Sequence, residues 1–328
     1  MAGTIRALRR RVLTPDVSQT QVAVRGFHDK GPESQEILES IGVSFLAGLS
    51  SAAGARRTTD VDTDLTDIPT RFQGFAYEGA GMGFALVDAI TPGTPRRSAE
   101  FLAGSGSDHV YMAYVGIGWA LARLPRFLWR RASAAATDPL LRWLVLDGYG
   151  FHQAYFRTAE YVHGRRAVPS FPWPPQGPAS YAARVVDQGI GRAIWFVAGT
   201  DPTLAADLID AFPAHRHQDL YSGAGLAATY AGGVTEEELH IFRHRCGQHA
   251  PFVAQASAFA AQARVRAGLL VPHTDLATRV FCRTGAIEAA RITDEEIPSA
   301  PSRSALPDYE VWRCAIADRF RADVTAQP

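Results

Sequence analysis

Five pairs of glycines, each pair separated by a single residue, recur within apolar stretches of this sequence. They are Gly79–Gly81, Gly116–Gly118, Gly148–Gly150, Gly189–Gly191 and Gly223–Gly225. The first glycines of successive pairs lie 37, 32, 41 and 34 residues apart, a spacing typical of arrays of paired helices. The sequence therefore predicts an all-α chain, a repeat array of helix pairs (an α-solenoid or α/α toroid), with about six units and atypical caps.

The apolar runs around the glycines have the length of helices rather than of strands. They place helices at residues 75–90, 109–124, 139–161, 180–198, 219–231 and 251–267. In the last of these, Ala254-Gln255-Ala256 follows Gly223 by 31 residues and is predicted to be a sixth copy of the motif with alanine replacing glycine. The proline-rich stretch 169–178 interrupts the series and indicates a hinge or lid.

The flanking regions lack the motif and divide the chain into three parts. Residues 1–70 are expected to form an N-terminal arm, a capping helix and an acidic loop, residues 71–268 the array, and residues 269–328 a set of C-terminal capping helices. The acidic stretch Asp60–Asp67 lacks the Gly and Glu of a calcium-binding loop. It partly matches the Asp-x-Asp-Asp motif of class II terpene cyclases, but a solvated loop explains it as well.

Glycine within a helix costs about 1 kcal/mol of helix stability relative to alanine. The five glycine pairs therefore require a compensating gain. Loss of the Cβ atom allows two helix backbones to approach closely, and we expect tight stacking of neighbouring helices. A phosphate-binding loop is excluded, because it needs its glycines just after a strand and at a helix N-terminus. Here the glycines lie inside the predicted helices.

Composition excludes several classes of partner. The formal net charge is zero and the pI is about 7.2, so no global field attracts nucleic acid. No uninterrupted apolar run approaches the roughly 20 residues of a transmembrane helix, and the arginines near the N-terminus are followed by no signal-like apolar segment. Residues 5–13 suit a solvated basic arm or a membrane-surface helix. Three cysteines without paired spacing suit a cytoplasmic location.

The residue before each first glycine is polar in four of the five copies. These residues are Glu78, Val115, Asp147, Gln188 and Ser222. If the array is curved, equivalent positions converge on one cavity. Aromatic residues near the motifs would form its walls, and the predicted ligand-binding residues are Tyr77, Tyr111, Trp119, Tyr149, Gln188, Arg192 and Tyr221. A hydrophobic polyene, polyketide or isoprenoid would suit such a cavity.

Glu78, Asp147 and His152 are the candidate catalytic residues. Burial would move the pKa of a carboxyl or an imidazole towards neutral pH, where proton transfer is efficient. The other interpretation is that His152 is a hydrogen-bonded core histidine and that neighbouring helices satisfy the carboxyls. We expect no cofactor and no metal, because His240 and His244 share a helix face but lack the Glu of a zinc motif. Arg184 and Arg192 flank Asp187-Gln188; they could bind an anion, but a structural ion pair with Asp187 is expected.

Several long blocks of the sequence resemble one known family. They are residues 72–80, 109–123, 138–152, 187–192 and 219–233, and they are similar to the actinobacterial family called domain of unknown function 1702. Members of that family are often labelled enediyne biosynthesis proteins and lie beside iterative polyketide synthase genes. The resemblance implies a role in specialised-metabolite biosynthesis but supplies no catalytic residues. An actinobacterial source also fits a composition with no Asn and a single lysine, Lys30.

Two hypotheses follow. In the first, the protein binds a long apolar chain in a helical cavity and promotes acid/base cyclisation or rearrangement, as a cofactor-independent cyclase or isomerase. In the second, it is a non-catalytic scaffold that binds a polyketide synthase or tailoring enzyme or shields a labile intermediate. A cavity of at least about 300 Å³ lined by Glu78 and Asp147 would favour the first, and a shallow face with both residues buried in helix packing would favour the second.

Overall fold

The computed structural model describes residues 2–168, 171, 178–301 and 304–325. Within these residues every regular element is a helix, which confirms the predicted all-α class. Most of the proline-rich stretch predicted as a hinge or lid lies outside the described residues.

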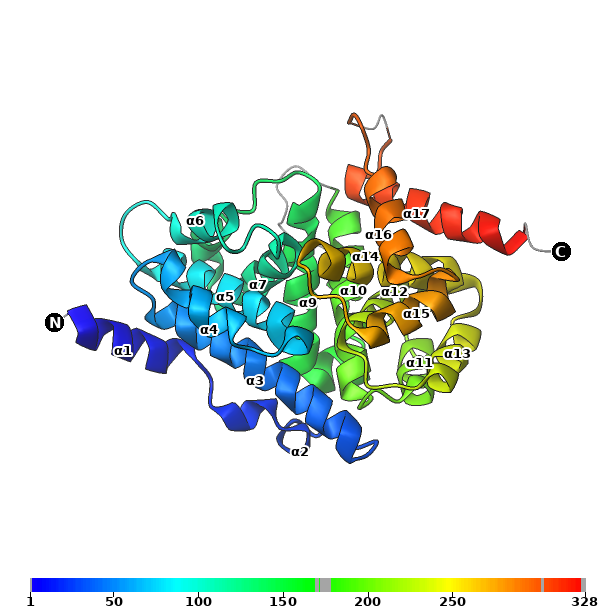
Figure 1. Cartoon of the computed structure of the whole chain (residues 1–328), viewed down its shortest axis with the longest axis horizontal. Coiled ribbons are helices and arrows are strands. Elements are labelled where there is room, and N and C mark those ends of the chain that lie inside the picture. The colour runs from blue at the N-terminus through cyan, green and yellow to red at the C-terminus, as the bar shows by residue number, and fades with distance from the viewer. Residues whose placement is uncertain (1, 169–170, 172–177, 302–303, 326–328) are drawn as a thin grey trace.

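Seven long helices pack against one another in chain order (Figure 1). They are α3 (Pro32–Gly54), α5 (Thr70–Ile90), α7 (Val110–Arg123), α9 (Leu144–Phe156), α10 (Ala179–Val197), α12 (Ala214–Ala231) and α14 (Ala250–Arg266). The most extensive contacts of the fold are between consecutive members of this series. The apolar core therefore runs continuously from one end of the series to the other.

Shorter helices connect the long ones and cover the ends of the chain. The connecting helices are α4 (Asp62–Thr66), α6 (Arg97–Ala103), α8 (Trp129–Ala132), α11 (Pro202–Asp210), α13 (Glu236–Arg245), α15 (Pro272–Cys282) and α16 (Ala286–Glu295). The terminal ones are α1 (Ala2–Leu13), α2 (Val22–Arg25) and α17 (Asp308–Thr325), and η1 (Val17–Thr20) follows α1. Helix α13 contacts both α11 and α15, and the three form an outer row beside the long helices.

The paired glycines form the contacts between consecutive long helices. A Cβ atom on Gly148 would overlap the carbonyl oxygen of Val115 in the preceding helix, and one on Gly150 would overlap that of Val186 in the following helix. The same relation recurs along the series. The first glycine always faces the carbonyl of the residue just before the first glycine of the preceding helix, as in the pairs Gly116–Glu78, Gly148–Val115, Gly189–Asp147 and Gly223–Gln188. The predicted close stacking is confirmed, and its register is constant.

This register extends to α3 and α14 and corrects one alignment. Gly48 of α3 meets Ala76 of α5, as the second glycines do elsewhere. Gly225 meets Val253 of α14, and in the other helices the residue so contacted lies three positions before the first glycine. The equivalent of that glycine in α14 is therefore Ala256 rather than the predicted Ala254, and Gln255 occupies the position before it.

The third predicted helix is shorter in the structure. The stretch expected over residues 139–161 contains a 3₁₀ turn, η4 (Leu141–Trp143), then α9 and a separate π turn, η5 (Ala159–His163). The Asp138 side chain accepts the N–H groups of Leu140 and Leu141, which holds the first turn. Arg157, with φ −123° and ψ 48°, leaves the helical region and ends α9.

One described helix, α3, is long and apolar enough to cross a membrane on length and composition alone. Half of its most apolar window is buried inside the fold, where α3 packs on α5. Core helices pass the same test, so this single helix is weak evidence for a membrane span.

Candidate functional site

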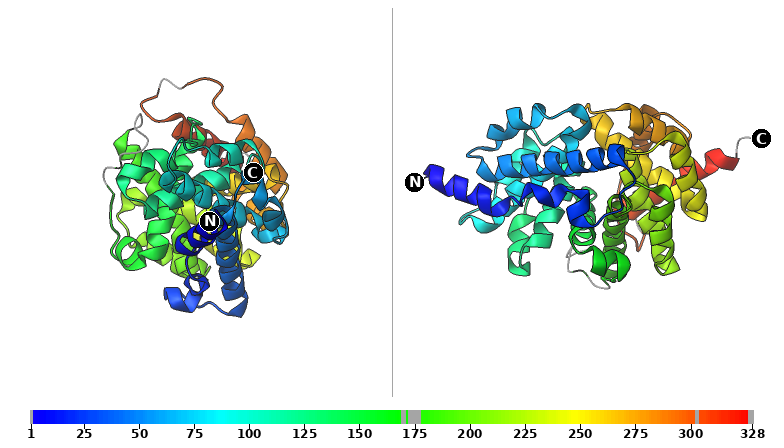
Figure 2. Two further views of the ribbon diagram at one scale, coloured as in Figure 1. Left: turned by 90° about the vertical axis from the view of Figure 1, so that its left-hand side faces the viewer. Right: turned by 90° about the horizontal axis from the view of Figure 1, so that it is seen from below.

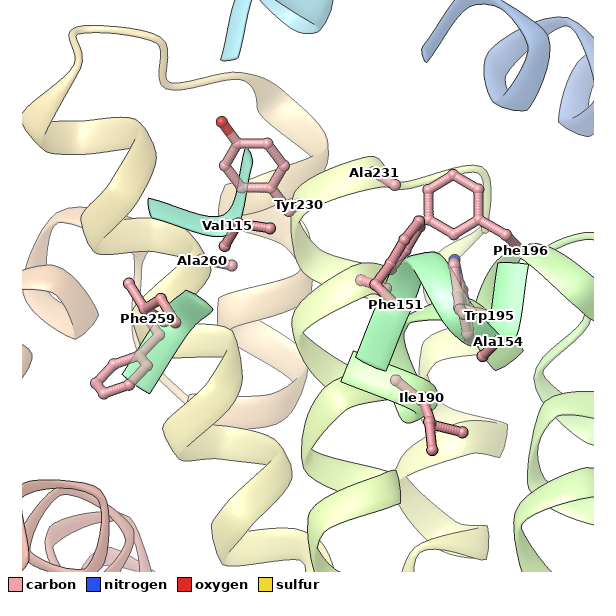
Figure 3. Close-up of a cluster of buried hydrophobic side chains, with 14 of the residues drawn as sticks. Val115, Phe151, Ala154, Ile190, Trp195, Phe196, Tyr230, Ala231, Phe259 and Ala260 are labelled. Atoms are coloured by element: carbon pink, nitrogen blue, oxygen red, sulfur yellow. The ribbon is translucent and has the colours of Figure 1, made fainter. Parts of the chain in front are cut away.

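A cavity of about 360 Å³ lies between α3, α5, α7, α9 and α10, and the segment around η1 closes one side of it. Its walls are mainly aromatic and aliphatic, and its lining includes Phe45, Leu49, Phe75, Met82, Trp119, Phe151, Tyr155 and Phe196. Phe151 and Phe196 point towards each other with ring centroids 5.2 Å apart (Figure 3). Its volume is within the range of small-molecule sites.

The cavity has a buried floor and a more exposed mouth. Glu78, Phe75 and Met82 are buried, whereas Arg123 is exposed and Gln19 is partly exposed. We infer that the cavity opens beside the N-terminal segment and ends at Glu78.

The lining residues follow a stripe along each helix that is defined by the glycines. In α9 the lining residues Leu144, Asp147, Phe151 and Tyr155 lie four before, one before, three after and seven after Gly148. The same four positions of α7 are Met112, Val115, Trp119 and Arg123, all of which line a cavity. Steps of three and four residues keep side chains on one face of a helix. The glycine contacts therefore turn one face of each helix inward.

A second, smaller cavity of about 50 Å³ adjoins the first, and the two share Phe75, Arg192 and Phe196. It is lined by the residues that stand at the position before the first glycine in five consecutive long helices. These are Val115, Asp147, Gln188, Ser222 and Gln255. The predicted convergence of these positions is confirmed for them, while Glu78 lines the larger cavity.

Arg192 connects the two cavities through a buried charge cluster, which we call the Glu78 cluster: Glu78, Asp147 and Arg192. Its guanidinium donates a hydrogen bond to Asp147 Oδ1. Its Nη2 lies 3.8 Å from Glu78 Oε1, beyond hydrogen-bond distance. All three side chains are buried. One cation therefore faces two carboxyls and is hydrogen-bonded to only one of them.

Glu78 is the incompletely paired member of this cluster. Its Oε1 is buried without a hydrogen-bond partner, and so is the neighbouring Trp119 Nε1, in the same cavity. Burial raises the pKa of Glu78 to about 7; the Arg192 charge opposes this rise, the Asp147 charge reinforces it, and the nearby Trp119 side chain opposes it to a smaller extent. Burial also raises the pKa of Asp147, although Arg192 counteracts this. A carboxyl that titrates near neutral pH can both donate and accept a proton.

His152 lines the same cavity as Glu78. Burial, with the charges of Arg123 and Arg25, lowers the pKa of His152 to about 3, so the imidazole is neutral at physiological pH. Its ring packs against Trp119 and Phe156, and its Nδ1 has no hydrogen-bond partner. The structure does not place it in contact with Asp147, which lines the smaller cavity.

The predicted ligand-binding residues are divided between the cavities and the rest of the core. Trp119 lines the larger cavity, Tyr111 and Gln188 the smaller one, and Arg192 both.

Three predicted tyrosines lie elsewhere. Tyr77 stacks on His109, Tyr149 packs on Trp129 and Phe171, and Tyr221 donates a hydrogen bond to Asp210. They stand one residue after or two before a first glycine, off the inward stripe.

A second charge cluster, buried except for the partly exposed Arg184, lies beyond Gln188. We call it the Arg313 cluster: Arg184, Asp219, Glu310 and Arg313. Arg313, from α17, donates to Asp219 Oδ1 at 3.1 Å and to Glu310 Oε2 at 2.7 Å. Arg184 reaches the same two carboxylates at 2.7 Å. The expected pair of Arg184 with Asp187 is wrong, because Arg216 occupies both oxygens of Asp187.

Sequence reasoning missed several lining residues. Phe75, Met82 and Phe196 all stand on the inward stripe, so counting from the glycines would have found them. Within the described residues, no group of three or more His, Cys, Asp or Glu is arranged to hold a metal ion.

Comparison with known proteins places the chain in a family. A family model described as "Protein of unknown function (DUF1702)" matches residues 4–320. The match covers nearly the whole sequence, so the chain belongs to this family. No curated protein and no solved structure matches it.

Proposed function

We propose that this member of the DUF1702 family binds a long apolar chain in the larger cavity and promotes its acid/base isomerisation or cyclisation without a cofactor. The observation that carries the proposal is Glu78. A buried carboxyl without a hydrogen-bond partner, whose pKa burial raises to about 7, stands at the floor of a cavity of about 360 Å³ with apolar walls. Perturbed carboxyls in such cavities are characteristic of functional sites.

The proposed chemistry is a proton transfer at Glu78. The protonated carboxyl gives a proton to one carbon of a conjugated polyene, and the carboxylate takes a proton from another carbon, which shifts the double bonds without net loss of atoms or electrons. Aromatic walls such as Trp119 and Phe151 stabilise the intermediate carbocation through their π faces. Arg192 and Asp147 supply a fixed charge environment beside Glu78. The apolar walls exclude water.

We further propose that the long helices form a repeat array closed around these cavities, as an α/α toroid. Two contacts support closure, because they join α14 and α12, near the end of the series, to α5, near its beginning. Arg264 of α14 donates to the carbonyl oxygens of Tyr230 in α12 and Arg71 in α5. The rings of Tyr230 and Phe75 meet edge to face at 5.1 Å.

The biological setting is also a proposal. The sequence blocks that resemble enediyne-associated proteins support a cytoplasmic role in actinobacterial polyketide biosynthesis, with a polyene from an iterative polyketide synthase as the ligand. The non-catalytic alternative, a scaffold that shields such an intermediate, uses the same cavity but needs no proton transfer at Glu78.

Binding and chemistry are tested separately. The purified protein is mixed with a linear conjugated polyene, with quenching of tryptophan fluorescence as the binding signal and the polyene absorption spectrum as the product signal. Leu46→Trp fills the cavity and should weaken binding at least tenfold. Val43→Trp, on the exposed face of the same helix, is the matched control and should leave binding unchanged.

Glu78→Gln should retain binding and lose product formation by a factor of at least about 100. Product formation at the parental rate in Glu78→Gln would refute the proposed role of Glu78. Binding without product in the parent protein would favour the shielding scaffold, and equal binding in Leu46→Trp would remove the cavity as the site.

A further inference from the structure

Two segments of the chain carry arginine without any acidic residue. Residues 2–13 contain Arg6, Arg9, Arg10 and Arg11, and residues 121–136 contain Arg123, Arg126, Arg130 and Arg131. Within the described part of the chain, none of these eight arginines forms a salt bridge, and every ion pair there involves another basic residue. A chain of zero net charge therefore holds a local excess of unneutralised positive charge.

Large apolar side chains are exposed on the same two segments and on η1, which follows the first. Phe127 is 80% exposed, Val12 66%, Leu8 61% and Val17 58%. Leu8 and Val12 are four residues apart in α1 and share a helix face. Exposed apolar side chains lower solubility and do not contribute to the folded core. Their presence beside the arginines therefore indicates a surface that binds another molecule.

A hydrogen bond joins the two segments at the mouth of the larger cavity. Arg123 Nη1 donates to the Leu13 carbonyl at 2.7 Å and so joins the end of α7 to the end of α1. Arg123 and the residues that follow α1, Pro15 and Gln19, line the cavity. Helix α1 itself lies along α3, which forms a cavity wall (Figure 2). We call this surface, made of α1, η1 and residues 123–130, the basic apolar face.

We propose that the basic apolar face docks on an anionic lipid surface, and that apolar ligand passes from the bilayer into the cavity there. Arginines attract anionic headgroups, each strengthening binding by about fivefold near the surface. Leu8, Val12 and Phe127 would enter the headgroup region, as the apolar face of an interfacial helix does. Nucleic acid would be held by the arginines but gives these apolar side chains no partner. The docking does not depend on proton transfer at Glu78.

Sedimentation of the full-length protein with vesicles tests the proposal. Vesicles of phosphatidylcholine with about 30% phosphatidylglycerol should bind the protein at least tenfold more strongly than pure phosphatidylcholine vesicles. Arg10→Gln/Arg11→Gln should weaken this binding by about tenfold or more. Phe127→Ser should weaken it as well, at unchanged net charge.

The controls change the same chemistry at the opposite end of the chain. Arg279→Gln/Arg291→Gln alters net charge equally, and Ile287→Ser removes an apolar side chain that is 68% exposed; both should bind vesicles like the parent. The proposal would be overturned by equal losses of vesicle binding in these controls, or by equal binding to anionic and neutral vesicles. It would also be overturned if the parent bound DNA but not vesicles and Arg10→Gln/Arg11→Gln lost that DNA binding. A parental thermal unfolding temperature in every variant ensures that a loss is not misfolding.

Discussion

The Glu78 cluster and the Arg313 cluster are built from the same groups, arginines and buried carboxylates, yet they differ in completeness: the first lacks hydrogen bonds that the second has. In the Arg313 cluster both carboxylates are reached by both guanidiniums, and Tyr181 and Gln188 add hydrogen bonds to the oxygens that accept from Arg313, Glu310 Oε2 and Asp219 Oδ1. None of its side-chain atoms is buried without a partner. In the Glu78 cluster Arg192 is hydrogen-bonded to Asp147 alone, and Glu78 Oε1 has no partner.

The difference follows from what surrounds each cluster. Arg313 projects from α17 and donates to residues of α12, α14 and α17, while Arg184 of α10 pairs with Glu310 of α17, so the network fastens the C-terminal helix to the long helices. Glu78 instead borders the larger cavity. A buried network in which every polar atom is hydrogen-bonded contributes to the stability of the fold. A buried polar atom without a hydrogen bond instead lowers stability, so folding does not explain its presence. An unsatisfied carboxyl beside a cavity therefore indicates function.

The largest expected effect is the loss of Arg313. Arg313→Met leaves Asp219 and Glu310 buried with one fewer cation, and should lower the free energy of unfolding by about 4 kcal/mol. Arg319→Met, on the exposed side of the same helix, should change it by less than about 0.5 kcal/mol. Urea denaturation at pH 7.5 measures both. Similar values for the two variants would show that the Arg313 cluster does not hold α17 in place.

Glu78→Gln should have the opposite sign and a pH dependence. Since burial raises the pKa of Glu78 from 4.5 to about 7, the folded state binds the proton more tightly than the unfolded chain does. Its stabilising contribution is complete below pH 4.5 and is lost as pH rises through 7. Glu78→Gln should therefore equal the parent near pH 4.5 and exceed it by about 3 kcal/mol at pH 8.

Glu310→Gln is the matched comparison in the Arg313 cluster. It removes a fully paired carboxylate and should destabilise the protein at pH 8. A destabilising Glu78→Gln at pH 8 would mean that Glu78 is as well paired as Glu310 and would erase the difference between the clusters.

A smaller effect is expected from the glycine contacts that both clusters depend on. In Gly189→Ala the new Cβ would overlap the Asp147 carbonyl, a backbone atom that cannot move alone, and the free energy of unfolding should fall by about 2 kcal/mol. In Gly54→Ala the nearest atom, Arg10 Cδ, is 3.4 Å away, so the better helix former should leave stability equal or slightly higher. A neutral Gly189→Ala would remove close stacking as the source of the register.

The helices and the glycine contacts could be predicted because their signals are local. Each of the five Gly-x-Gly copies lies inside an apolar run and requires a closely packed neighbouring helix. The residue before each first glycine, polar in four of the five copies, shares one helix face with the other residues on the stripe. The three outlying tyrosines were not distinguishable, since being aromatic and near a glycine does not fix the helix face.

The charge partners were beyond reach for a different reason. Arg192 pairs with Asp147, 45 residues away, and Arg313 pairs with Asp219, 94 residues away. Such pairs depend on how the helices are placed in space, and local spacing suggested Arg184 with Asp187 instead. The part of the cavity wall formed by the segment around η1 was likewise unpredictable, because the residue types of Pro15 and Gln19 do not indicate which helices this segment packs against.

The protonation of Glu78 itself is the most direct test of the account. Infrared difference spectra of the parent protein against Glu78→Gln, recorded from pH 4 to pH 9, isolate the carbonyl band of the protonated Glu78 carboxyl. The band should be present at pH 6 and disappear with a midpoint at about pH 7. A midpoint below about pH 5, the range of an ordinary glutamate, would contradict the claim that Glu78 is an incompletely paired acid that can transfer a proton near neutral pH.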